Sequence, residues 1–74
     1  MIDRTGIIVY FQNKKAIKII EKFDIHITYI NEAGKYLVGY CNKLDFPKIK
    51  KELRQKKLIR KVEESLIEMP SLEL

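Results

Sequence analysis

The order of strand-like and helix-like segments most constrains how this chain can fold. Two segments repeat apolar side chains at helical spacing, residues 14–23 and the stretch that follows Asp45. Four runs rich in β-branched and aromatic residues are too short for helices and indicate strands at residues 6–12, 25–31, 35–41 and 62–67. The predicted order is therefore strand, helix, strand, strand, helix, strand.

This order predicts an α+β, ferredoxin-like β-α-β-β-α-β sandwich, in which one four-stranded antiparallel sheet carries two helices on one face. Right-handed crossovers place strands 6–12 and 35–41 side by side in the centre. With 74 residues the chain has room for one domain, residues 1–74. We expect an ordered core at about 6–68 and a frayed tail at 69–74.

Local signals set the element ends. Asn13 and Asp45 are predicted N-caps, because their side-chain oxygens can accept from first-turn amides. Pro47 suits the first turn of the second helix, where a missing N–H does no harm. Gly34 is expected to take positive φ in the turn between the second and third strands.

Side chains alternate along the two central strands and so divide between two faces. The small, apolar set on the third strand, including Gly39, would let a helix approach closely. We therefore assign to the helix side Ile7, Val9, Phe11, Leu37, Gly39 and Cys41. The opposite, open side then holds Ile8, Tyr10, Tyr36, Val38 and Tyr40, since phenols favour places where the hydroxyl meets water or a partner.

This open face would expose more apolar surface than a monomeric protein normally leaves in contact with water. Short chains also often gain stability by oligomerising when they lack disulfides and metals. We therefore predict a non-enzymatic interaction or regulatory module, which self-associates as a homodimer or docks another protein through these five residues. Alternatively, lysine side chains and the C-terminal segment fold across the face. The sequence names no biochemical role.

A nucleic-acid-binding module that uses the same face is the second hypothesis. The chain has a net charge of +5, and Lys35, Arg60 and Lys61 would form a basic rim. The stretch "AGKYLVGY" (residues 33–40) partly matches the third-strand pattern of RNA-recognition motifs. However, Lys35 and Leu37 stand where that pattern has its stacking aromatics.

Catalytic patterns are missing from the sequence. His26 and Cys41 are the single histidine and the single cysteine, and neither has a nucleophile or base partner nearby in sequence. His26 is expected to be a partly exposed strand residue and Cys41 a small buried one. No glycine-rich phosphate loop or paired acid appears. We predict no enzyme, catalytic residue, cofactor, metal site or small-molecule substrate.

The N-terminal residues lack the features of a secretory signal, and the longest apolar run is far shorter than a membrane span. A single cysteine fits a reducing compartment. We therefore expect a cytoplasmic protein with no membrane contact.

The chain resembles the YlbG-like family of small bacterial cytoplasmic proteins. The similarity covers about residues 6–66 and runs through "GIIVYFQNKKAIKIIEKF", "TYINEAGKYLVGYCN" and "LIRKVEES". The order and spacing of "IVY", "KY…YC" and "KVE.S" carry it. The resemblance implies a single cytoplasmic domain and supplies no activity.

Overall fold

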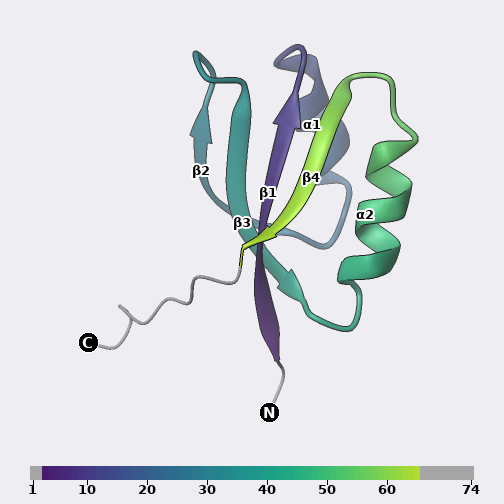
Figure 1. Ribbon diagram of the computed structural model, residues 1–74. Coiled ribbons are helices and arrows are strands. Elements are labelled where there is room, and N and C mark those ends of the chain that lie inside the picture. Colours follow the sequence, from purple (N-terminus) through teal and green to yellow (C-terminus); the bar gives the residue numbers. More distant parts are fainter. Residues whose placement is uncertain (1–2, 66–74) are drawn as a thin grey trace.

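The computed structural model describes residues 3–65 of the chain. Its elements follow the predicted order (Figure 1) and comprise β1 (Arg4–Phe11), α1 (Lys15–Glu21), β2 (His26–Asn31), β3 (Tyr36–Asn42), α2 (Phe46–Arg54) and β4 (Ile59–Ser65). Residues 66–68 of the expected core and the expected tail, 69–74, lie outside the described residues.

The four strands form one antiparallel sheet in the order β2-β3-β1-β4. The predicted ferredoxin-like arrangement, with β1 and β3 in the centre, is therefore confirmed. In Figure 1, α1 lies behind the sheet and α2 lies beside β4. The sheet ends in two edge strands, β2 and β4.

Both helices pack on one side of the sheet and close a single core. The apolar stripe of α2 is buried, with Phe46, Ile49 and Leu53 facing inward. α1 contributes Ala16 and Ile20. The core also includes the helix-side residues of the central strands, Ile7, Val9, Phe11, Leu37 and Cys41. The predicted division of these strands into two faces is confirmed, because burial alternates along β3.

β4 begins earlier than predicted. Ile59 pairs with Phe11 and is buried, so the strand starts there rather than at Val62. A bulge separates this pair from the Tyr10–Lys61 pair, and it shifts the side-chain alternation of the strand. The predicted start of the strand at Val62 is therefore three residues too late.

The turn and cap predictions are corrected in three places. Lys35, not Gly34, takes positive φ, at 59°. The amide of Gly34 instead donates to the side-chain oxygen of Asn31 at 2.6 Å, which ties the turn to the end of β2. Asp45 occupies the predicted N-cap position of α2, but its side chain makes no cap hydrogen bond. The N-cap of α1 is Lys14 rather than the predicted Asn13, and no side chain caps this helix. Asn13 lies one residue earlier, and its side-chain oxygen accepts from the Lys15 amide at 2.8 Å.

Gly39 was predicted to let a helix approach the sheet, but in the structure it makes room for the backbone of β2. A Cβ at this position would meet the carbonyl oxygen of His26 and lie 3.0 Å from the Cα of Ile27. These are backbone atoms of β2, next to a register shift between Ile27 and Tyr29. The absence of a side chain at Gly39 therefore lets the backbone of β2 approach β3 closely where the bulge interrupts their pairing.

Candidate functional site

The side of the sheet away from both helices, here called the open face, is built from three cross-strand rows. One row runs from β2 to β4 through Asn31, Tyr36, Tyr10 and Lys61; the next through Tyr29, Val38, Ile8 and Glu63; the third through His26, Tyr40, Gly6 and Ser65. Side chains in one row are direct neighbours, so this register decides which groups can act together.

The five residues predicted to bind a partner lie together on the open face. Each is half-buried, and they occupy the central strands β1 and β3, namely Ile8, Tyr10, Tyr36, Val38 and Tyr40. Partial burial here comes from neighbours on the same face, because the helices lie on the opposite side. The face therefore presents a connected apolar and phenolic surface, while its binding of a partner stays a prediction.

Three tyrosine rings form a cluster across three strands. The ring centroids of Tyr10 and Tyr36 are 6.0 Å apart, and those of Tyr29 and Tyr36 are 6.1 Å apart, with interplanar angles of 49° and 51°. Tilted rings at this separation attract one another. The Asn31 amide lies within 3.4 Å of the hydroxyl oxygens of Tyr29 and Tyr36 and donates to them. The cluster is thus held in place before any partner arrives.

Tyr29 also belongs to the open face, although it was not among the residues predicted to lie there. The register shift after Ile27 places Tyr29 opposite Val38 and Ile30 opposite Leu37. Tyr29 is 52% exposed, more than the five predicted residues. No local sequence signal marks such a bulge. The only hint in the sequence is a tyrosine within a β-branched strand, a residue type that favours a surface where its hydroxyl meets water or a partner.

A charged pair borders the cluster on β4. The Lys61 ammonium lies 2.7 Å from a Glu63 carboxylate oxygen and 5.9 Å from the centroid of the Tyr10 ring. The Tyr10 hydroxyl lies 3.5 Å from the same carboxylate, a long hydrogen bond. Hydrogen bonding to Glu63 raises the pKa of Lys61, and hydrogen bonding to Lys61 lowers the pKa of Glu63. Both groups are therefore held in their charged forms.

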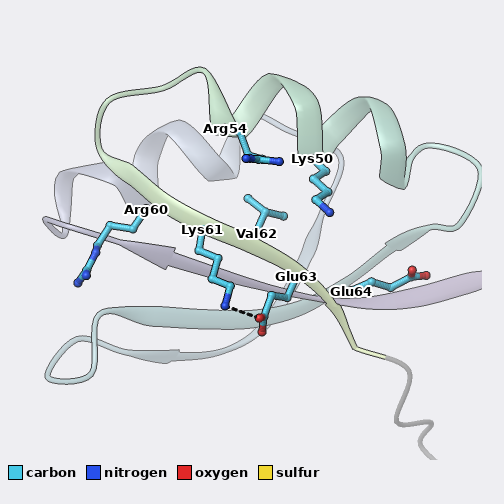
Figure 2. A pocket seen from close by; sticks show the side chains of 7 residues that line it. All are labelled: Lys50, Arg54, Arg60, Lys61, Val62, Glu63 and Glu64. Carbon is cyan, nitrogen blue, oxygen red and sulfur yellow. Dashed lines mark ion pairs between the residues drawn. The ribbon is translucent and has the colours of Figure 1, made fainter.

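The predicted basic rim is spread over two ends of the face rather than gathered. Lys35 lies in the β2–β3 turn, whereas Arg60 and Lys61 lie on β4. All three side chains are exposed. Figure 2 shows Arg60 pointing away from Lys61 and Glu63. The three basic residues therefore place positive charge at two separate ends of the face, and one of them, Lys61, is paired with Glu63.

A hollow of about 600 Å³ lies along the outer edge of β4 (Figure 2). It is lined by Lys50, Arg54, Arg60, Lys61, Val62, Glu63 and Glu64. Lys50 and Arg54 come from α2, while the other lining residues come from β4. In Figure 2, Val62 points toward the helix, and Lys61 and Glu63 point to the other side of the strand.

His26 is an exposed strand residue and Cys41 a small buried one, as predicted. Both line a smaller hollow of about 210 Å³, together with Arg4, Asp24, Tyr40 and Asn42. His26 is exposed, and Cys41 is 4% exposed. Burial, followed by nearby carboxylates, raises the pKa of the Cys41 thiol, so it stays protonated and a poor nucleophile. Within residues 3–65, no group of three or more His, Cys, Asp and Glu side chains could hold a metal ion.

Comparison with known proteins identifies the family. The model of a bacterial family described as "Uncharacterized protein conserved in bacteria (DUF2129)" matches residues 4–73. The chain belongs to the DUF2129 family. UPF0298 proteins of Staphylococcus aureus strains JH9 and Newman are each 34% identical to it over 65 residues, which cover 88% of this chain and 76% of theirs. No solved structure matches the chain.

Membership of the DUF2129 family confirms the resemblance to YlbG-like bacterial proteins. The match spans every element of the sheet and both helices, so the open face lies within the family's shared domain. The family description names no activity. Neither helix in the described part of the chain is long and apolar enough to cross a membrane.

Proposed function

We propose that this DUF2129 protein is a small, non-enzymatic interaction module that docks another protein on its open face. The carrying observation is the tyrosine cluster of Tyr10, Tyr29 and Tyr36 beside the half-buried Ile8 and Val38. Tyrosine is enriched in protein interfaces, because its ring is apolar and its hydroxyl can bond. A cytoplasmic location is part of the proposal, since a single cysteine forms no internal disulfide.

Charge at the margin indicates what kind of protein would bind. Glu63 is paired with Lys61, and Arg4, Lys35 and Arg60 add exposed positive charge around the face. A partner with apolar side chains inside an acidic border would complement this pattern. Two copies docked face to face would bring like charges together, so the open face suits a different protein better than itself.

Site-specific crosslinking in bacterial cells tests this proposal. A photoreactive residue at position 29, on β2 and the most exposed position of the tyrosine cluster, should capture one protein that the same residue at Lys18, on α1, does not capture. That protein, once purified, should bind the wild-type chain and lose at least about tenfold in affinity with Tyr40→Glu, because a carboxylate would enter an apolar contact. Gln55→Glu adds the same charge at an exposed site at the end of α2 and should bind normally.

Two results would overturn the proposal. One is the absence of any adduct specific to position 29. The other is a purified partner whose affinity is unchanged by Tyr40→Glu.

Nucleic-acid binding is the second candidate, and the cluster of three tyrosine rings favours it. Tyr29, Tyr36 and Tyr10 could each stack a base, with Lys61 above the last ring to meet a phosphate. Binding to short single strands, measured by fluorescence anisotropy, should then weaken steeply with salt and drop with Tyr36→Ala. A lack of binding at low salt would exclude this candidate.

A further inference from the structure

The outer edge of β4 has backbone groups directed away from the sheet. The Phe11 amide donates to the Lys35 carbonyl at 2.9 Å. The backbone N–H and C=O groups of Phe11, and of every second residue before it in β1, therefore point toward β3. The backbone N–H and C=O groups of Ile8 and Tyr10 therefore point toward β4, where these residues pair with Glu63 and Lys61. The backbone groups of Lys61 and Glu63 therefore face β1. Those of Val62 and Glu64, the residues that follow each of them, point away from the sheet.

The side chains along this edge form a self-complementary charge sequence. Arg60 and Lys61 precede Val62, and Glu63 and Glu64 follow it. In an antiparallel pairing of two β4 strands about Val62, Lys61 of each copy lies opposite Glu63 of the other. Arg60 similarly meets Glu64, next to the bulge. Charged side chains usually keep an edge strand from pairing, but here the two ends carry opposite signs and attract.

We propose that β4 pairs antiparallel with β4 of a second copy of the chain, on a two-fold axis through Val62. The outward N–H and C=O of Val62 then bond to those of Val62 in the second copy. Two sheets become one continuous sheet. The interface is isologous, because each copy contributes the same strand, as closed symmetric dimers require.

The hollow beside β4 gives the second strand space and further complementary charge. Lys50 and Arg54 of α2 line it above the strand edge, near Val62. Glu64 lies on the helix side of the sheet, opposite Ile7, and accepts a hydrogen bond from Thr5 at 2.7 Å. In the pair, Glu64 of each copy approaches the basic side chains of the other copy's α2. The contact thus offsets the positive charge of two facing helices.

This inference stands apart from the proposed function, since the tyrosine cluster is not part of the pairing. The two-fold axis runs perpendicular to the sheet, so both open faces lie on the same side of the joined sheet. A dimer would then present two tyrosine clusters side by side, and a partner with two matching sites would bind more tightly to the dimer than to one copy.

Charge exchange on β4 tests the pairing. Sedimentation velocity across concentration should show a dimer for the wild type. Lys61→Glu alone, or Glu63→Lys alone, should weaken it at least about tenfold, because like charges then face each other across the axis. The double variant, Lys61→Glu with Glu63→Lys, should restore the dimer. An equimolar mixture of the two single variants should also pair, since each then faces its opposite.

Lys18→Glu and Glu21→Lys make the same charge changes on exposed positions of α1 and should leave the dimer unchanged. A wild-type monomer at every concentration overturns the proposal, as does a double variant as weak as the single ones. Tyr40→Glu should keep the dimer, so loss of open-face binding and loss of pairing are separable results.

Hydrogen exchange checks the register without mutation. The amides of Val62 and Glu64 should gain protection as protein concentration rises, while those of Lys61 and Glu63 are protected in monomer and dimer alike. Concentration-independent exchange at Val62 and Glu64, in a sample that sedimentation shows to be dimeric, would mean that the dimer uses another surface and would overturn the proposal.

Discussion

The rings of Tyr10 and Tyr36 face each other across the two central strands, with centroids 6.0 Å apart and planes tilted by 49°. The two residues are also direct cross-strand partners. A contact between neighbouring strands stabilises the sheet and, at the same time, shapes the surface that a partner would meet. Its energetic and binding roles can be measured separately.

The first prediction concerns this ring contact. In a double-mutant cycle of Tyr10→Ala and Tyr36→Ala, followed by urea unfolding, we expect a coupling free energy of about 0.5–1.5 kcal/mol. The control cycle pairs Tyr10→Ala with Tyr40→Ala, whose side chain lies in a different cross-strand row. Equal coupling in both cycles would show that the ring contact adds nothing specific.

The second prediction concerns Gly39. Gly39→Ala should lower the free energy of unfolding by about 1–3 kcal/mol, because the new methyl group meets the backbone of β2 at the His26 carbonyl. Gly34→Ala is the matched control. There a Cβ approaches the Tyr36 ring edge at 2.9 Å, and a side chain can move aside. Urea denaturation should rank Gly39→Ala as clearly the less stable variant, and the reverse order would contradict this account of the bulge.

The third prediction compares Asn13, which lies one residue before the N-cap of α1, with Asp45, the N-cap of α2. Asn13→Ala should cost about 1 kcal/mol, because it removes the acceptor of the Lys15 amide. Asp45→Ala should cost only a few tenths, about 0.3 kcal/mol, since Asp45 makes no side-chain cap bond and acts through its charge near the start of α2. Thermal and urea unfolding of the two variants measure the difference. Equal losses would mean that charge, rather than the hydrogen bond, matters at both sites.

The fourth prediction concerns pH. The folded chain raises the pKa of Cys41 above its ordinary value of about 9, mainly by burial and then through Asp45, Glu64 and Asp24. The unfolded chain therefore loses the thiol proton first as pH rises. Stability contributed by the protonated thiol is present below about pH 9 and is lost as pH rises through the folded pKa.

The measurement is urea unfolding between about pH 8 and about pH 10.5 for the wild type and Cys41→Ala. Lysines and tyrosines titrate in both proteins, so the difference between the two curves isolates the thiol. The wild type should lose stability more steeply than Cys41→Ala. Parallel curves would show that the thiol pKa is unshifted.

Much of the fold follows from local pattern. Side chains on a strand alternate, so the division of β1 and β3 into a core side and an open side could be predicted, down to Ile8, Tyr10 and Tyr40. Apolar spacing likewise predicted the buried stripe of α2, and composition excluded any pair of cysteines. These features depend on the period of one element and not on its neighbours.

Other features depend on how one strand meets another, and only the tertiary structure decided them. Bulges at Ile27–Tyr29 and beside Tyr10 interrupt the alternation. They bring Tyr29 into the tyrosine cluster and start β4 at Ile59. Positive φ falls on Lys35 rather than Gly34, since the Asn31 side chain holds the turn.

By itself the sequence therefore determined which residues favour strand or helix and which face each prefers, because those preferences are local. The three-dimensional pairing decided which side chains touch across the sheet and which backbone groups remain at its edge. The charge order of residues 60–64 was always in the sequence. Its meaning as a self-complementary edge came only with the position of β4 at the end of the sheet, since charges along a strand can pair between copies only where that strand has an open side.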